Sequence, residues 1–549
     1  MNKLSTWLLA STLFAAPMAI HAQYHSEVWN PDNGNGTYTN PVIYADYSDP
    51  DVVAVGDDYY LTASSFNCIP GLPILHSKDL VNWEIINYAL QEQEPKSLFD
   101  HPQHGKGVWA PSIRYHQGEF YIYWGDPDQG VFMVKTKDPR GEWSKPLCVI
   151  PGKGLIDTCP LWDEDGKCYL VNGWAGSRSG FNSILTVREL SADGTKAIGK
   201  PCIVFDGGQA NHTTEGPKFY KRDGWYWIMC PAGGVQNGWQ LAMRSKSPYG
   251  PYESKMVMAQ GKSPINGPHQ GGWVHTPQGE DWFLHFNDQY AYGRVVCLQP
   301  VHWKNNWPVM GNDKDGDGCG EPYVTYRMPK SSSHTKVNPQ ESDEFNDTKL
   351  GLQWQWHANY NPLWGMPTNS GCYRLYNADL SADFKSLWEA GNLLLQKTPA
   401  TTFKATAKMR FASKADDQYG GIIMMGMDYQ ALVVRRIGNE FQLQQLSCQK
   451  ADKGGMETVR TLATLPPTAQ DKGDYAPALY IDIYMQMKVK GGKCQFAYSL
   501  DGKHFRDAGE LFTMRQGKWI GAKMGFVSER KNVKGNRGWI DADWFRVTK

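Results

Sequence analysis

Short runs rich in aromatic and β-branched residues recur along the first 300 positions, each directly after a turn that contains glycine or paired aspartates. Their spacing of about 45 to 60 residues is typical of repeated structural units. A second apolar run lies about ten residues upstream of each one, as in a β-hairpin. The five downstream runs cover residues 56–62, 117–123, 165–171, 223–229 and 278–284. This pattern predicts an all-β fold that begins with five blades of four short strands, a five-bladed β-propeller.

A second region follows a change of composition. Residues 329–340 are rich in Pro, Ser, Lys, Thr and Gln, which is typical of a linker. Beyond them, apolar and polar residues alternate over 403–411, 480–489 and 539–547. Alternating strands joined by glycine-rich turns predict a β-sandwich. The predicted domains are a signal peptide at 1–22, the propeller at 23–328, the linker at 329–340 and the sandwich at 341–549.

The first strand of every blade in a propeller borders the central axis, so residues at these strand starts meet at one end. Three of them are carboxylic acids, at Asp49, Asp157 and Glu215. Trp109 and the pair His269–Gln270 occupy the other two blades. One acid at a strand start is more often a turn residue that faces water. Three acids at the same place in the repeat favour a shared pocket instead.

The same positions carry a family resemblance. The chain resembles glycoside hydrolase family 43 over about residues 37–325, through the ordered motifs Ser48-Asp49-Pro50-Asp51-Val52, Trp109-Ala110-Pro111-Ser112, Ile156-Asp157 and Glu215-Gly216-Pro217. The resemblance implies an inverting glycosidase that releases terminal pentose, β-1,4-linked xylose or α-L-arabinofuranose, from plant hemicellulose oligosaccharides. The region after the linker resembles the concanavalin-like β-sandwich found in many xylosidases of this family.

The acids divide into roles that glycoside hydrolysis requires. One acid must protonate the leaving oxygen, and a base must activate water on the opposite face of the sugar ring. Glu215 is the predicted acid and Asp49 the predicted base. Asp157 is predicted to keep Glu215 protonated, because a neighbouring negative charge disfavours ionisation. The resemblance assigns the same three roles, and it places substrate contacts at Phe66, Trp109 and Arg294.

Metal binding is predicted only as structural support, since the chemistry needs no cofactor. Many relatives have a Gly-His pair where this chain has Pro268-His269-Gln270, so either His269 or Gln270 could hold an axial calcium ion. A second hypothesis concerns Asp313-Lys314-Asp315-Gly316-Asp317-Gly318, which resembles the start of a calcium loop. Val324 stands where an EF-hand would have its bidentate glutamate, so this is no EF-hand.

Charge and composition limit the partners. The 56 acidic and 56 basic residues balance, so no basic surface for nucleic acid is indicated. Aromatic residues make up 13%, with 22 Trp, which suits sugar stacking as well as β-sheet cores. The apolar stretch within 1–22 predicts export to the periplasm or medium, and no later run is long enough to span a membrane.

Several alternatives stay open at this point. Xylosidase and arabinofuranosidase activity are not distinguished by the sequence. A carbohydrate-binding propeller without catalysis, or a hydrolase of galactan or arabinan, would share the same pattern. The sandwich could bind sugar, lend a loop to the rim of the active site, or only cover the propeller.

Overall fold

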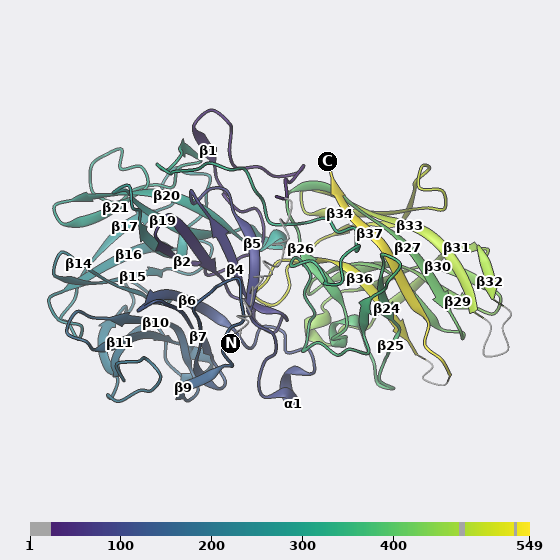
Figure 1. Cartoon of the computed structure of the whole chain (residues 1–549), viewed down its shortest axis with the longest axis horizontal. Coiled ribbons are helices and arrows are strands. Elements are labelled where there is room, and N and C mark those ends of the chain that lie inside the picture. Colours follow the sequence, from purple (N-terminus) through teal and green to yellow (C-terminus); the bar gives the residue numbers. More distant parts are fainter. Residues whose placement is uncertain (1–22, 472–477, 532–534) are drawn as a thin grey trace, which may run out of the picture.

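A computed structural model describes residues 23–471, 478–531 and 535–549, so the predicted signal peptide lies outside the described residues. Two bodies built of β-strands lie side by side (Figure 1), the propeller at the left of the view and the sandwich at the right. The predicted all-β fold is confirmed. The described helices are short, and none is long and apolar enough to cross a membrane.

Five four-stranded antiparallel sheets form the propeller, and the predicted count of blades is confirmed. Blade one contains β2 (Asp51–Val55), β3 (Asp58–Thr62), β4 (Gly71–Ser77) and β5 (Glu84–Leu90). Blade two contains β6 (Trp109–His116), β7 (Glu119–Asp126), β8 (Gly130–Thr136) and β9 (Leu147–Pro151). Blade three contains β10 (Leu155–Trp162), β11 (Cys168–Trp174), β12 (Ile184–Leu190) and β13 (Cys202–Asp206). All five predicted downstream runs form the second strand of a blade.

The remaining blades close the ring. Blade four contains β14 (Lys218–Arg222), β15 (Trp225–Ala232), β16 (Trp239–Ser245) and β17 (Glu253–Ala259). Blade five contains β18 (His269–His275), β19 (Asp281–Asp288), β20 (Arg294–Lys304) and β21 (Trp307–Met310). Strand β1 (Thr37–Thr39) pairs with β22 (Thr325–Arg327), which ties the chain before blade one to the chain after blade five. The ring is closed because β18 packs against β2.

The sandwich has one sheet of eight strands and one of seven. The first has the order β23 (Gly365–Pro367), β24 (Tyr373–Tyr376), β37 (Trp539–Thr548), β27 (Thr402–Ser413), β33 (Ala478–Lys490), β34 (Lys493–Ser499) and β35 (Arg506–Thr513), with β32 (Ala469–Asp471) paired to β33. The second has the order β25 (Ala378–Asp379), β36 (Lys523–Arg530), β28 (Gln418–Met425), β29 (Tyr429–Ile437), β30 (Glu440–Cys448) and β31 (Thr458–Leu465), with β26 (Leu394–Lys397) paired to β36.

The alternation seen in the sequence explains the core of the sandwich. Every second residue of β27 and β33 is buried along most of their length. Phe411 and Ile483 of the eight-stranded sheet meet Leu432 and Phe526 of the other sheet in one apolar cluster. Because side chains alternate between the faces of a strand, one face of each sheet supplies this core.

Short helices lie only in connections of the described chain. They are α1 (Lys96–Phe99), α2 (Gly176–Ser179) and the 3₁₀ turns η1 (Tyr290–Tyr292), η2 (Leu387–Glu389) and η3 (Ala451–Lys453). The connection that contains α1 reaches the sandwich, where the His104 ring stacks on Trp388 with centroids 3.6 Å apart. The connection after β3 also reaches it, because the backbones of Ile69 and Trp356 exchange hydrogen bonds of 3.0 and 2.6 Å. Loops from the mouth of the propeller are therefore held by the second domain.

Candidate active site

One residue near the start of each blade adopts left-handed backbone geometry. The five residues and their φ angles are Asp49 (54°), Ala110 (37°), Asp157 (57°), Gly216 (60°) and Gln270 (34°). In blades two, three and five, the pairing register between the first two strands shifts at this same position. Such geometry is rare for residues other than glycine and is concentrated at functional sites. Asp49 and Asp157 share this position, whereas Glu215 lies one residue earlier in its blade.

These strand starts surround a single pocket. It is lined by Asp49, Phe66, Trp109, Ala110, Ile156, Asp157, Glu215, Val235, His269, Gln270, Arg294 and Trp519. Every residue predicted for the site is present, including both alternatives in blade five. Trp519 belongs to the sandwich and was not predicted. Its local sequence, a tryptophan followed by an isoleucine in a short turn between Gly517 and Gly521, is the only signal that could have indicated it.

Asp49 is 5% exposed and lies in a polar, positively charged setting. Nη1 of Arg294 donates to its two carboxylate oxygens at 3.1 and 3.3 Å. Oγ of Ser64 donates to Oδ2 of Asp49 at 2.6 Å, and the same Oγ accepts a hydrogen bond from the backbone N–H of Ala110 at 2.8 Å. A guanidinium and a hydroxyl both stabilise a carboxylate in its charged form.

Glu215 has a different setting. Its side chain is 31% exposed because it lines the open pocket, and Nε2 of His269 lies 3.5 Å from its Oε1. Burial in the propeller raises the pKa of Glu215 to about 8, and the charges of Asp157 and Asp49 contribute to the rise. Arg294 opposes the shift. Glu215 therefore keeps its proton at neutral pH, whereas Asp49 in the same pocket is bound by Arg294.

Asp157 lies beside Glu215 and is 4% exposed. Burial raises its pKa to about 6, and the charge of Asp49 adds to the rise. The backbone N–H of Gly216 donates to its Oδ2 at 2.8 Å, which opposes the shift. Lys218 also opposes it, and its buried ammonium group donates to the carbonyl of Pro111 and to Oγ of Ser112.

His269 is 1% exposed, and neither ring nitrogen has a hydrogen-bond partner. Burial lowers its pKa to about 3, with a further contribution from Arg294, so the ring is neutral. Among the described residues, no group of three or more His, Cys, Asp or Glu ligand atoms converges at His269 or Gln270. These residues do not form the oxygen-rich cage that calcium prefers. The axial cation therefore stays a prediction.

Aromatic rings form the wall of the pocket. Phe66 and Trp109 meet edge to face with centroids 6.3 Å apart, and Trp109 and Trp519 meet in the same way, also at 6.3 Å. Ile520 packs with Phe66 and Trp109 in a small cluster that joins the two domains. The sandwich thus completes the wall of the pocket, which is one of the three roles that the sequence left open for it.

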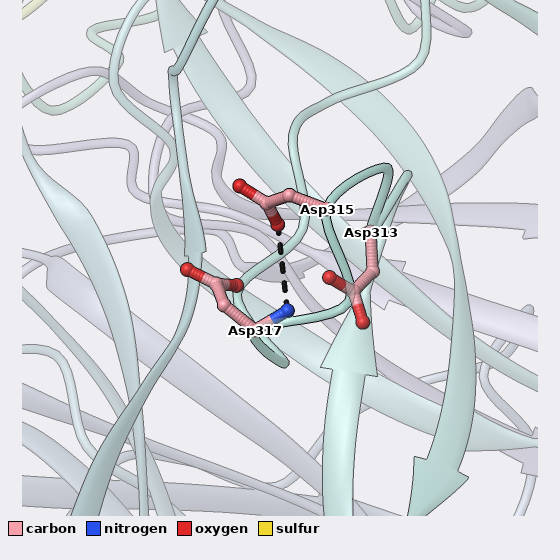
Figure 2. A group of neighbouring side chains, drawn as sticks. All are labelled: Asp313, Asp315 and Asp317. Atoms are coloured by element: carbon pink, nitrogen blue, oxygen red, sulfur yellow. Dashed lines mark hydrogen bonds between the residues drawn. The ribbon is translucent and has the colours of Figure 1, made fainter.

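The aspartates of the predicted calcium loop lie close together (Figure 2), and none of them lines this pocket. One carboxylate oxygen each from Asp313, Asp315 and Asp317 lies within 4.8 Å of the others. Backbone N–H groups of the same loop donate to all three side chains. Lys304 lies 3.7 Å from Asp313. Neighbouring backbone and lysine groups thus already stabilise much of this negative charge.

Comparisons with known proteins agree with this architecture. Residues 38–308 match the family model for glycosyl hydrolases family 43, and residues 342–548 match the β-xylosidase C-terminal concanavalin A-like domain. A putative β-xylosidase of Xylanibacter ruminicola is 36% identical over 90% of this chain and 87% of its own length. A β-xylosidase of Formosa agariphila is 32% identical over 97% and 93%.

Two further proteins extend the comparison. A non-reducing end α-L-arabinofuranosidase of Bacteroides ovatus is 31% identical over 73% of this chain and 77% of its own length. The crystal structure of a GH43 protein from Bacillus licheniformis is 26% identical, covers 93% of this chain and 99% of that chain, and superposes with a TM-score of 0.78. Propeller, sandwich and relatives all agree, and the chain therefore belongs to glycosyl hydrolases family 43.

Proposed function

We propose that this chain is an inverting exo-glycosidase that releases terminal pentose, xylose or α-L-arabinofuranose, from hemicellulose oligosaccharides. The observation that carries the proposal is the contrast between two acids in one pocket. Asp49 accepts hydrogen bonds from Arg294 and Ser64, whereas burial and two neighbouring acids raise the pKa of Glu215. A carboxylate bound by an arginine and a carboxyl group whose pKa is raised can provide the base and the acid of glycoside hydrolysis.

The reaction would proceed in a single displacement. Glu215 donates its proton to the glycosidic oxygen as the bond from that oxygen to the anomeric carbon breaks. Asp49 takes a proton from a water molecule whose oxygen attacks the anomeric carbon from the opposite face. The products are a free sugar of inverted configuration and an alcohol. Glu215 then recovers a proton from solvent, and Asp49 releases one.

Inversion follows from the placement of the two acids. Asp49 belongs to blade one and Glu215 to blade four, and these blades are not neighbours in a ring of five. Acids on opposite sides of the axis leave room for the attacking water, whereas a retaining enzyme needs a nucleophile close to the acid. Asp157, in blade three next to Glu215, is better placed to hold the proton of the acid than to attack.

Release from a chain end is supported by the enclosure of the pocket. Phe66, Trp109 and Trp519 form a wall to which both domains contribute, and such a wall admits one terminal sugar more readily than an internal segment. Sugar rings stack favourably on aromatic faces. The names of the relatives, β-xylosidase and α-L-arabinofuranosidase, support pentose as that sugar. Export of the chain to the periplasm or medium would give it access to such oligosaccharides.

Proton NMR of the first product tests the proposal. During the first minutes of hydrolysis of an aryl β-xyloside, we expect the α-anomer of xylose to appear before mutarotation produces the β-anomer. The same assay with nitrophenyl arabinofuranoside and galactoside ranks the substrates. β-Xylose as the first product would overturn Asp49 as the base, and failure to hydrolyse any of the panel would favour a sugar-binding propeller.

A further inference from the structure

Asp46 lies three residues before Asp49, is 4% exposed and does not line the pocket. Its carboxylate accepts two backbone N–H groups from opposite sides. Oδ1 accepts that of Arg294, the first residue of β20, at 2.9 Å. Oδ2 accepts that of Gly521, in the sandwich, at 3.0 Å. One buried carboxylate therefore joins the two domains beside the pocket.

The fit around this carboxylate depends on two glycines. A Cβ at Gly293 would lie 2.5 Å from Cγ of Asp46, and a Cβ at Gly521 would lie 2.7 Å from the carbonyl oxygen of Tyr292. The N–H of Ala522 also donates to the carbonyl of Ala291 at 2.7 Å. Backbone from the sandwich is thus packed directly on the backbone that leads into β20.

Both partners of Asp46 continue into the pocket. The guanidinium group of Arg294 binds Asp49 and lies 5.9 Å from the ring of Trp519. Trp519 is two residues before Gly521, and its φ of 64° is rarely adopted by residues other than glycine. A backbone in this conformation needs support from its surroundings to persist, and the hydrogen bond from Gly521 to Asp46 provides part of that support.

We propose that Asp46 is a positioning residue, which fixes the Trp519 loop of the sandwich, residues 515–521, against Arg294 and thereby against Asp49. This inference rests on the proposed function for its kinetic consequence. A carboxylate can accept from both N–H groups at once, whereas an amide can accept from only one and points its own NH₂ group at the other. Asp46→Asn keeps the shape of the side chain and breaks the link on one side.

The kinetic test uses this variant on an aryl β-xyloside. We expect kcat/KM to fall by about tenfold to hundredfold, because a buried N–H group loses its acceptor next to the base. Asp79→Asn is the matched control. Asp79 is also buried and accepts the N–H groups of Val81 and Asn82, but it lies in a turn of blade one outside the pocket lining. We expect this control to alter thermal stability and leave kcat/KM unchanged.

A double-mutant cycle separates positioning from general loosening. If Asp46 acts through the Trp519 loop, the effects of Asp46→Asn and Trp519→Ala on kcat/KM are not additive. Without the Trp519 side chain, a displacement of the loop has little further effect on the pocket. Asp79→Asn combined with Trp519→Ala is expected to be additive. Additive effects for Asp46 and Trp519, or a kcat/KM for Asp46→Asn equal to that of the wild type, would overturn the proposal.

Amide hydrogen exchange supplies a readout that does not depend on catalysis. Asp46→Asn should speed exchange in the peptide that covers residues 515–522 more than in peptides from the sandwich core, and Asp79→Asn should not. Unchanged exchange in that peptide would overturn the link between the domains. If the wild type hydrolysed no glycoside, the proposed function would fail, and the exchange result would still decide whether Asp46 holds the loop.

Discussion

Two groups of three carboxylates in the described part of the chain differ in almost every physical respect. Asp49, Asp157 and Glu215 come from three blades and meet in a pocket inside the propeller. Asp313, Asp315 and Asp317 come from one loop, and the last two are exposed (Figure 2). The pKa of Asp157 and of Glu215 is raised by burial and by neighbouring acids. The number of acids in a cluster therefore says less about protonation than their burial does.

The loop group shows how a protein ordinarily stabilises adjacent acids. Exposure to solvent, the N–H groups of the loop backbone and Lys304 stabilise the charges. In the axial group, Arg294 and Ser64 bind Asp49 and the N–H of Gly216 binds Asp157, whereas Glu215 has only the ring of His269 nearby, with Nε2 3.5 Å from its Oε1 and no hydrogen bond between them. Keeping Asp49 and Asp157 buried beside Glu215 costs stability, and a reaction that needs one of the three acids protonated explains the arrangement.

The largest effect is expected at the two axial acids with catalytic roles. Glu215→Gln and Asp49→Asn each preserve side-chain volume and remove one proton transfer, so kcat/KM on a xyloside should fall by about 10²- to 10⁴-fold. Circular dichroism and thermal melts should show an intact fold. Retention of more than a few per cent of wild-type kcat/KM by either variant would remove that residue from the mechanism.

A smaller effect is expected at Asp157, and it concerns pH more than rate. Glu215 acts while protonated, so activity should be lost as pH rises through its pKa of about 8. Asp157→Asn removes one of the charges that raise this pKa, and the alkaline limb of the kcat/KM profile should therefore move to lower pH. Asp482→Asn, at a half-exposed acid paired with Arg410 in the sandwich, is the matched control. If the alkaline limb of the Asp157→Asn profile stays at the wild-type pH, Asp157 does not raise the pKa of Glu215.

Much of this architecture is predictable from the chain because each blade repeats a local signal. The turns before Tyr59, Phe120 and Trp225 precede runs that pair only with a neighbour in sequence, so hairpins follow from local pattern. The strand starts then identify Asp49, Asp157 and Glu215 without knowledge of any contact between them. The sequence did not show which residue of each blade has left-handed backbone geometry. In blades one and three it is the acid itself, whereas in blade four it is Gly216, the residue after Glu215.

Contacts between the domains could not be predicted. Asp46 and Gly521 are separated by 475 positions, and nothing periodic connects them. Trp519 resembles many other tryptophans of a chain that has 22 of them. Its place in the pocket depends on how two complete domains pack, which is a property of their surfaces. Local patterns in the sequence identify the acids of the site, whereas the wall that encloses them depends on tertiary packing.

The smallest effect is expected from metal removal, and this experiment returns to the two groups of acids. At the axis, Arg294 and Lys218 already supply positive charge near the acids, and at the loop Lys304 does so. Since the predicted calcium is structural and takes no part in the proton transfers, we expect chelation and dialysis to lower kcat/KM less than any of the acid substitutions does. A fall in activity or melting temperature that calcium restores would support the predicted axial cation, and no change in either would count against it. Asp315→Asn then locates the ion: if the variant still responds to calcium, the ion is near His269, and if the response is lost, the ion belongs to the loop.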